Sequence, residues 1–447
     1  MLAALRLALV AALVMAACGE DDPPLGPGPD ASTTDADAPV DAGAPDLGPP
    51  DAGEAPPCDP VGTPLGPGFA PPPRDDMAYA ADADCGRLFM FFGDGSVPTA
   101  CNVPRTAHLT DGFVYDARRG AWFQLNPENQ GPVARDRAAA IWDSARARFV
   151  MTGGRSGPSL ARTYHDDVWA YAPDTNRWER LDLGAEPRPT GRMDFLMVAD
   201  PEGDRFIVSH GGQLRPNLSF AVFDDTWAFD LDQGTWSRLA TTGESPPGRV
   251  YPSGALDPRR RQMWLFGGSG ENAFVEPPTR TMAVLDLVTG AWTRLPPDAS
   301  WPKARFNAAM IHDPERDRML LFGGHDDTDL GNDNDLHAFD LDRRRWSLLR
   351  SGDQLNADPI DQCNFPGNFT LADLESPERR AAHLLAAISP DAAVLFGGNT
   401  DCGVANDTWS LDLGSDTWSQ LTASPVGMTC PRTGNPNCDD PSARMCD

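Results

Sequence analysis

Short apolar blocks separated by turns organise this chain, and the clearest example is the segment Arg192–Leu239. It contains four such blocks, Phe195–Val198, Arg205–Val208, Asp225–Phe229 and Trp236–Leu239. The turn-forming residues Asp200-Pro201, the doublet Gly211-Gly212 and Asp232-Gln-Gly234 separate them. Short apolar runs bounded by Gly, Pro and Asp are typical of β-strands. The segment therefore predicts four short strands joined by turns.

The same pattern occurs six times, and a repeat at a nearly constant period decides the architecture before local structure does. An arginine opens each unit, at Arg74, Arg135, Arg192, Arg249, Arg305 and Arg379. Glycine doublets follow the second block at Gly153-Gly154, Gly211-Gly212, Gly267-Gly268, Gly323-Gly324 and Gly397-Gly398, and unit one has Gly93-Asp94-Gly95 instead. A tryptophan opens the last block, at Trp122, Trp178, Trp236, Trp292, Trp346 and Trp418. The units extend over 74–125, 132–181, 188–239, 246–295, 302–349 and 376–421.

The second block of each unit indicates how the units pack. Met263–Phe266 and Met319–Phe322 are continuously apolar, as expected for strands that are covered on both faces. One short four-stranded sheet cannot bury both faces by itself, whereas radial stacking of several sheets can. We therefore expect an all-β protein with four antiparallel strands per unit, and we expect each tryptophan to pack between neighbouring units.

Six residues separate each tryptophan from an upstream aromatic residue or leucine, namely Tyr115, Tyr171, Phe229, Leu285, Phe339 and Leu411. Together with the glycine doublets, this spacing resembles the kelch repeat, and the resemblance covers Arg74–Leu421. It implies a six-bladed β-propeller at residues 58–425, followed by a Cys-rich tail at 426–447. By analogy with the family, it also implies a protein that binds a protein or glycan ligand through loops on one face.

The N-terminal residues predict export and a lipid anchor. Residues 1–17 combine Arg6 with the apolar run Leu7–Val14, which is too short to span a bilayer. The small residues before Cys18 resemble a bacterial lipoprotein signal, which implies a lipidated Cys18; ordinary cleavage after Ala17 is the alternative. Residues 18–57 are dominated by Asp, Ala, Pro and Gly, a composition typical of a disordered tether. We expect anchoring in a bacterial cell envelope, on its periplasmic or outer side.

The acidic net charge of the chain limits which classes of molecule it can bind. The chain has 37 basic and 65 acidic residues and a formal net charge of −28. Binding to phosphate backbones needs Lys and Arg, so nucleic acid is excluded as a partner. We expect a monomer whose partners are a protein or glycan of the envelope and, through the N-terminal lipid, the membrane.

Eight cysteines besides Cys18 predict disulfides in an oxidising compartment. They are Cys58, Cys85, Cys101, Cys363, Cys402, Cys430, Cys438 and Cys446. All belong to the first unit, the last unit with its approach loop, or the flanking tails, so we hypothesise that disulfides close the first blade against the last. Cys363–Cys402 is the one specific pair we predict, because alternating strand direction puts both loops on the same face.

Two features are candidates for ligand binding. The six arginines precede the innermost strands and should ring one mouth of the channel, either to hold an anion or to pair with Asp167, Asp225, Asp335, Asp407 and similar residues. The second candidate is the long connection Arg350–Ser376, which carries Phe365 and Phe369, together with the loop Gly324–Asp335. Unusually long loops are often functional, so we assign the contact surface to this face.

No catalytic or metal-binding motif is present. The seven histidines lack metal-ligand spacing, and the oxygen-rich run Asp326–Asp335 lacks the full calcium-loop pattern. We predict no cofactor and no catalytic residue. Two alternatives stay open: a carbohydrate-active enzyme of galactose-oxidase-like or epimerase-like type that uses the channel mouth, and a passive envelope scaffold. The enzyme would require His, Tyr or carboxylate side chains to converge at that mouth.

Overall fold

The computed structural model describes residues 58–59, 61–66, 68–95, 108–158, 161–182, 184, 186–273, 276–326, 331–356, 370–400 and 403–424. All of them belong to one compact unit, Pro56–Asp447. Apart from one 3-10 turn, η1 (Pro201–Gly203), every regular element in these ranges is a strand. The described part of the chain contains no helix long and apolar enough to cross a membrane. The prediction of an all-β protein is confirmed.

Six antiparallel sheets, blade one to blade six, follow one another along the chain. Blades one to three contain β2 (Ala78–Asp82), β3 (Arg87–Phe91), β4 (Gly112–Asp116) and β5 (Ala121–Leu125); β6 (Asp136–Asp143), β7 (Arg148–Ser156), β9 (Val168–Ala172) and β10 (Arg177–Arg180); and β11 (Leu196–Asp200), β12 (Arg205–Ser209), β15 (Thr226–Asp230) and β16 (Thr235–Arg238). Blades four to six contain β18 (Ser253–Asp257), β19 (Gln262–Phe266), β20 (Met282–Asp286) and β21 (Ala291–Leu295); β22 (Ala309–Asp313), β23 (Arg318–Phe322), β24 (Leu336–Asp340) and β25 (Arg345–Arg350); and β29 (Leu384–Ser389), β30 (Ala392–Phe396), β33 (Thr408–Asp412) and β34 (Thr417–Thr422).

Short strands extend this plan at the edges and in the loops. β1 (Thr63–Pro64) adds to blade one beside β5, and β17 (Thr242–Gly243) adds to blade four beside β21. The loops between second and third strands carry β8 (Thr163–Tyr164), β13 (Gly212–Leu214), β14 (Phe220–Val222), β31 (Asn399–Thr400) and β32 (Gly403–Val404), with β28 (Arg380–Ala381) paired to β31. The long connection after blade five forms a ribbon of β26 (Gln354–Leu355) and β27 (Thr370–Leu371).

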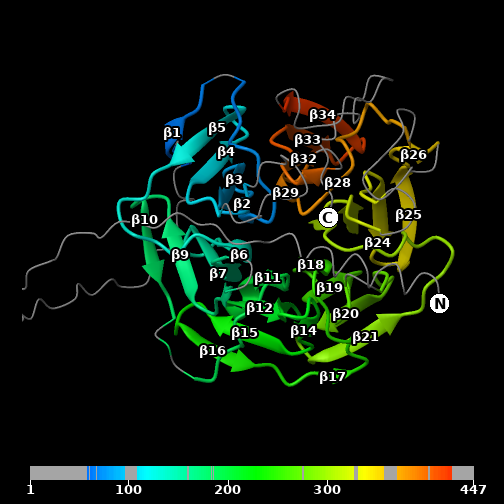
Figure 1. Ribbon diagram of the computed structural model, residues 1–447, viewed down its shortest axis with the longest axis horizontal. Helices are drawn as coiled ribbons and strands as arrows, with labels where there is room; N and C mark the ends of the chain where they lie inside the picture. Colours follow the sequence, from blue (N-terminus) through cyan, green and yellow to red (C-terminus); the bar gives the residue numbers. More distant parts are fainter. Residues whose placement is uncertain are drawn as a thin grey trace, which may run out of the picture. The chain divides into compact units, whose positions relative to one another are not determined.

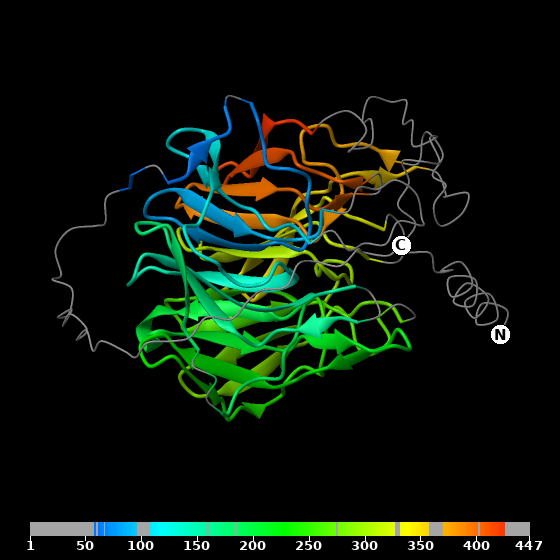
Figure 2. The same cartoon turned by 60° about the vertical axis from the view of Figure 1, so that its left-hand side comes forward.

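The blades form a closed ring. The first strands contact one another in the cycle β2, β6, β11, β18, β22, β29 and back to β2. A glycine amide at the end of each second strand donates to the carbonyl of the arginine that opens the next blade, as from Gly154 to Arg192 at 2.8 Å. The last of these six bonds joins Gly398 to Arg74 at 2.9 Å. Figures 1 and 2 show the first blade, in blue, beside the last, in red and orange. The expected propeller architecture is therefore present.

The tryptophans pack between blades, as expected. Trp178 in blade two lies with its ring centroid 4.7 Å from that of Phe91 in blade one, and Trp418 in blade six lies 4.8 Å from Phe322 in blade five. The residue seven positions upstream is the direct cross-strand partner, as in the pair Tyr171 and Trp178. The repeat spacing thus reflects one interlocking contact between adjacent sheets.

In two blades, the pair of residues with positive φ at the end of the second strand does not coincide with the glycines expected from the sequence. In blade three the two residues with positive φ are His210 (64°) and Gly211 (87°), so the pair starts one position before Gly211-Gly212. In blade one they are Phe92 (64°) and Gly93 (101°). Only the second position is always glycine, because a Cβ on Gly211 would lie 2.6 Å from the Phe195 side chain. The close approach, and not the doublet itself, is the conserved structural requirement among the blades.

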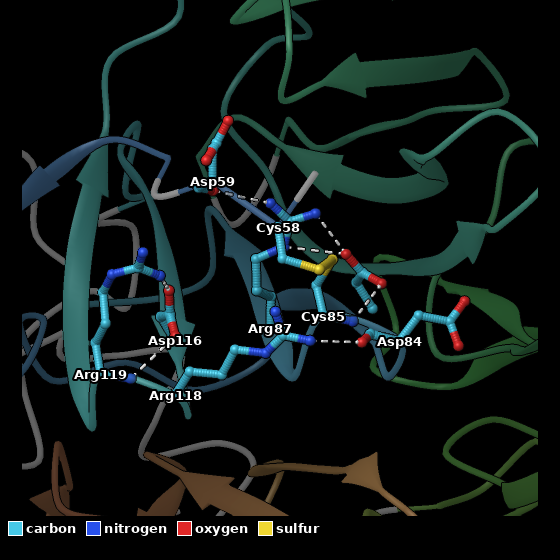
Figure 3. Close-up of a disulfide and its surroundings, with 9 residues drawn as sticks. Cys58, Asp59, Asp84, Cys85, Arg87, Asp116, Arg118 and Arg119 are labelled. Atoms are coloured by element: carbon cyan, nitrogen blue, oxygen red, sulfur yellow. Dashed lines mark hydrogen bonds and ion pairs between the residues drawn. A yellow bond between two sulfur atoms is a disulfide. The ribbon is translucent and has the colours of Figure 1, made fainter. Parts of the chain in front are cut away.

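One disulfide, Cys58–Cys85, lies within the described residues, with 5.3 Å between the Cα atoms (Figure 3). It ties the segment before β1 to the turn between β2 and β3, so it does not join blade one to blade six. The described contacts that close the ring are noncovalent, including a hydrogen bond of 3.0 Å from Asn406 Nδ2 to the Pro71 carbonyl. The other cysteines lie outside the described residues: Cys18, Cys101, Cys363, Cys402, Cys430, Cys438 and Cys446.

Candidate functional site

The arginine that opens each blade is a buried clasp. In blade three, Arg192 Nη1 donates to the His210 carbonyl at 2.8 Å, and its Nη1 and Nη2 hold the two carboxylate oxygens of Asp225 at 2.6 and 3.1 Å. The side chain is only 3% exposed. Four further pairs have this form, Arg74–Asp111, Arg135–Asp167, Arg305–Asp335 and Arg380–Asp407. The aspartate immediately precedes the third strand in every case.

Blade six corrects one prediction. Arg380, not Arg379, occupies the clasp position, since Arg380 Nη1 reaches both the Gly397 carbonyl at 2.8 Å and Asp407. Arg379 instead lies with Nε 3.3 Å from Asp353 Oδ2, in the long connection. Adjacent arginines carry the same sequence signal, and only the packing against the neighbouring blade distinguishes them. We call Arg74, Arg135, Arg192, Arg249, Arg305 and Arg380 the clasp arginines.

Five clasp arginines are satisfied within the chain, which favours the structural alternative over an anion-binding ring. Although burial alone would raise the pKa of Asp225, hydrogen bonds and the charge of Arg192 hold it below its ordinary value. A buried bidentate pair of this kind has no free donor face for a ligand. Arg249 in blade four differs, because Thr281 stands where the other blades have the aspartate.

A second ring lies two residues after each clasp arginine. These six residues all have positive φ, between 52° and 60°, and they are Asp76, Arg137, Asp194, Tyr251, Asn307 and Ala382. Their backbones are joined from blade to blade, for example from the Tyr251 amide to the Asp194 carbonyl at 3.0 Å and from the Asp76 amide to the Ala382 carbonyl at 3.1 Å. This ring lies at the start of the innermost strands, where the sequence predicts one mouth of the channel. We call it the mouth ring.

The mouth ring carries ionic groups on one side. Arg137 lies between two carboxylates, with Nε 3.0 Å from Asp76 Oδ2 and Nη1 3.1 Å from Asp194 Oδ2. Its guanidinium carbon also lies 5.1 Å from the centroid of the Tyr251 ring. Burial raises the pKa of Asp194 to about 7, against the opposing effect of Arg137, and burial likewise raises the pKa of Asp76. This is the convergence of carboxylates and tyrosine that an enzyme at the mouth would require.

From Tyr251, which also faces Arg137, a series of aromatic contacts extends through blades three to five. Ring centroids of Phe220 and Tyr251 lie 5.7 Å apart, those of Tyr251 and Phe306 5.4 Å, and those of Phe306 and His325 5.1 Å. These residues come from blades three, four and five. The mouth is therefore chemically asymmetric, although its backbone repeats in every blade.

One group of potential metal ligands is present in the described residues: Asp257 at the end of β18, His312 in β22 and Asp317 in the turn after β22. Arg260 already donates to both carboxylates, at 2.7 Å to Asp257 Oδ2 and 2.7 and 2.6 Å to the two oxygens of Asp317. A bound cation would have to displace this guanidinium. The acidic run 326–335 is described only in part, and there Lys303 Nζ lies 3.4 Å from Asp326.

The long connection is held by a buried polar anchor. Asn334 Nδ2 donates to Asp353 Oδ1 at 3.0 Å, and the Asp353 amide donates back to Asn334 Oδ1 at 2.8 Å. Asp353 Oδ1 also accepts from the Asp373 amide at 2.8 Å, which joins the two ends of the connection. Phe365 and Phe369 lie outside the described residues, so their assignment to a contact surface stays a prediction.

Beyond this anchor, the β26–β27 ribbon exposes aliphatic side chains. Leu355 is 43% exposed, Leu371 62% and Leu374 60%. Leu355 opposes Thr370 and Gln354 opposes Leu371, so the two leucines lie on opposite faces of the ribbon. Figure 1 shows β26 beside β25 at the edge of blade five. We call Leu355, Leu371 and Leu374 the ribbon leucines.

The sequence predicted neither the mouth ring nor the individual ribbon leucines, although we assigned the contact surface to the connection Arg350–Ser376 that carries them. The mouth ring could have been found by aligning the position two residues after each arginine, but its residues share a backbone conformation and no side-chain type. The ribbon leucines carry no periodic signal, because they fall within an insertion that occurs in one blade.

Comparison with known proteins agrees with this geometry. A family model for the KLHDC2/KLHL20/DRC7 Kelch-repeats domain matches residues 62–268 and 255–438. Multiple epidermal growth factor-like domains protein 8 from Rattus norvegicus is 28% identical over 290 residues, 63% of this chain and 9% of that protein. Kelch domain-containing protein 10 from Bos taurus is 23% identical over 271 residues, 59% of this chain and 54% of that protein. Kelch domain-containing protein 1 from Mus musculus is 25% identical over 294 residues, 52% of this chain and 70% of that protein.

Proposed function

The chain belongs to the kelch-repeat family, and from this premise we propose that it is a binding protein that captures a protein partner through the ribbon after blade five. The observation that carries the proposal is the set of ribbon leucines, which are exposed on a stem that buried polar groups hold in place. Leu355 and Leu371 face opposite sides of the ribbon, so a partner that grips the ribbon would cover both, and exposed apolar side chains close together mark protein–protein contact sites. Glycan recognition, the alternative, would be better served by exposed aromatic rings and hydrogen-bonding groups.

The stem supports the proposal because it limits the entropy lost on binding. Asn334, Asp353 and Arg379 are each less than one tenth exposed, and they connect the ribbon to blade five and blade six. A pre-organised loop loses little conformational freedom when a partner docks. The ribbon leucines therefore offer apolar area, about 25 cal/mol for each Å² removed from water, at low ordering cost.

We further propose that the protein acts at a bacterial cell envelope, held by a lipid on Cys18 and separated from the membrane by residues 18–57. The signal-like N-terminus, the acidic Pro- and Ala-rich composition of that segment and the Cys58–Cys85 disulfide support this location, since disulfides persist in oxidising compartments. Mass spectrometry of the protein purified from membranes should find a diacylglyceryl-modified Cys18. An unmodified Cys18, or a chain still carrying residues 1–17, would refute the anchor.

The test of binding compares full-length variants in a pull-down from envelope extract. Replacing Leu355, Leu371 and Leu374 together with serine should reduce partner recovery at least tenfold without changing the cooperativity of thermal unfolding. The matched control is Val288→Ser, because Val288 is 69% exposed but lies in the turn between β20 and β21. Equal recovery with the triple variant and wild type would contradict the proposal. A glycan array run beside the pull-down distinguishes a glycan ligand, and a hit there that the triple variant retains would move the site elsewhere.

A second candidate, an enzyme that acts on sugars at the mouth ring, is favoured by one observation, the convergence of Asp76, Asp194 and Tyr251 around Arg137. A carboxyl group with a pKa near 7 suits general acid–base chemistry. However, the Asp194 side chain is 4% exposed and Tyr251 is 7% exposed, so a substrate would reach them only after a rearrangement. Turnover of a sugar substrate that Asp194→Asn abolishes would establish this candidate.

A further inference from the structure

Arg249 is the one clasp arginine without an aspartate. Its Nε donates to the Pro247 carbonyl at 3.0 Å and its Nη1 to the Gly267 carbonyl at 2.8 Å, as in the other blades. The position that holds the aspartate elsewhere is Thr281, and no carboxylate of the described residues lies within ion-pair distance of Arg249. The residue is nevertheless only 3% exposed. A guanidinium that is buried without a counterion is costly.

Blade four differs from the other blades at a second position, next to the place of the clasp aspartate. Two residues beyond the clasp aspartate, Trp169, Trp227 and Trp409 each donate from Nε1 to the carboxylate at 2.8 Å, and His337 Nε2 lies 2.8 Å from Asp335. The equivalent residue in blade four is Ala283. Blade four therefore lacks both the carboxylate and the large side chain that packs on it, and smaller residues stand in both places.

In most of the other blades, the clasp carboxylate lies within reach of solvent. In four of the other blades the clasp aspartate keeps side-chain exposures of 25% for Asp111, 17% for Asp167, 18% for Asp225 and 16% for Asp335. The arginine beneath each of them is at most 3% exposed. An anion from solution could therefore approach Arg249 along the direction from which an aspartate contacts the other clasp arginines.

The surroundings of Arg249 are positively charged. Arg294 is the cross-strand partner of Ala283 and is exposed to solvent. Burial, together with the nearby charge of Arg294, lowers the pKa of Arg249 to about 10. The nearby His210 is buried and its pKa is also lowered, first by burial and then by Arg249. Two guanidinium groups without a carboxylate attract an anion, most of all a planar one that fits the guanidinium fork.

We propose that Arg249, with Arg294 above it, binds the carboxylate group of a small ligand in the place that the clasp aspartate occupies in the other blades. The ligand class is a small organic acid, or a larger molecule that presents a single accessible carboxylate. The site is in blade four, apart from the ribbon, and it does not depend on the proposed protein partner. The other five clasps show the geometry that the bound group would adopt.

The test supplies the missing carboxylate from within the chain. Wild type and Thr281→Asp are heated in sodium acetate and in sodium chloride at equal ionic strength and pH. Acetate should raise the Tm of wild type by about 1–3 °C in a saturable manner, because a ligand that binds only the folded state stabilises it by mass action. Thr281→Asp should have a higher Tm than wild type in chloride and should show no saturable response to acetate.

A matched control at position 281 distinguishes the effect of the negative charge from the effect of side-chain size. Thr281→Asn has the size of aspartate but no charge, so it cannot neutralise Arg249, and it should not show the rise in Tm that Thr281→Asp shows in chloride. Asp225→Thr opens the corresponding position in blade three; it should lower the Tm, and acetate should restore part of the loss. An absent saturable response in wild type, or an equal response in Thr281→Asp, overturns the proposal.

Discussion

The indole Nε1 of Trp122 in blade one donates a hydrogen bond of 3.0 Å to Thr408 Oγ1 in blade six, across 286 positions of sequence. Both residues are buried, and Thr408 Oγ1 also accepts from Thr422 Oγ1 at 2.8 Å. This bond lies at the junction where the two ends of the propeller meet. The apolar cluster around it combines Trp122 and Phe113 of blade one with Phe396 and Leu384 of blade six.

We expect Trp122→Phe to weaken the closure of the ring. The substitution removes the indole donor, and a buried hydrogen bond contributes about 1 kcal/mol to the free energy of unfolding. The matched control is Trp346→Phe, because Trp346 is equally buried but its Nε1 has no partner within the described structure. Urea unfolding should show that Trp122→Phe costs about 1 kcal/mol more than Trp346→Phe. Equal costs would mean that the bond to Thr408 does not stabilise the closure.

Removing the Cys58–Cys85 disulfide should destabilise blade one. The bond closes a loop with a sequence separation of 27, for which the chain-entropy relation gives about 3.5 kcal/mol. A double replacement with serine should therefore lower the free energy of unfolding by about 2–4 kcal/mol. Peptide mapping without reduction checks the premise, since it should recover Cys58 and Cys85 in one linked fragment. A free Cys85 thiol in protein purified from the envelope would contradict the bond.

The mouth ring should make stability fall as pH rises. Asp194 has a pKa of about 7 in the folded protein and about 4 in the unfolded chain, so the folded state binds the proton more tightly. Its contribution is complete below pH 4 and is lost as pH rises towards 7, by up to about 4 kcal/mol at 1.36 kcal/mol per pKa unit. Asp194→Asn should reduce this slope in unfolding measured from pH 4 to 8, and the slope that is left belongs to Asp76, whose pKa burial also raises.

The control for this experiment is Asn307→Ala, which truncates another mouth-ring residue without changing the number of titrating groups. It should displace the whole stability curve and leave its slope unchanged. If Asp194→Asn keeps the wild-type slope, the carboxyl group does not retain its proton in the folded state.

His210 should act in the opposite direction over the acid range. Burial, with the positive charge of Arg249, lowers its pKa to about 3, whereas the unfolded chain has a value near 6.5. As pH falls from 6.5 to 5, the unfolded state takes up a proton that the folded state rejects, so stability is lost by about 2 kcal/mol. His210→Gln should lose about that much less than wild type between pH 7 and pH 5 in urea titrations. Parallel losses in the two proteins would show that His210 is protonated in the fold.

The sequence alone was sufficient to predict the repeat and the contacts that recur in every repeat. The cross-strand pairing of Tyr171 with Trp178, and the packing of Trp178 on Phe91, follow from spacing because every blade must bury the same faces against its neighbours. Of the two alternatives for the arginines, the structure contains the pairing with aspartates such as Asp167 and Asp225. The sequence could not show which of Arg379 and Arg380 takes the clasp position. Adjacent identical residues differ only in the carbonyl and carboxylate groups that they contact.

The features in which one blade differs from the others became visible only in the tertiary structure. Thr281 and Ala283 carry no distinctive signal in the sequence, and their consequence for Arg249, which has no aspartate partner among the described residues, follows only from the packing of the blades. The mouth ring unites Asp76, Arg137 and Asp194 from three successive blades. The repeating sequence determines the contacts that all blades share, because the blades bury equivalent surfaces. Where the blades differ, the charge and the room around a side chain depend on neighbours that only the closed ring brings together.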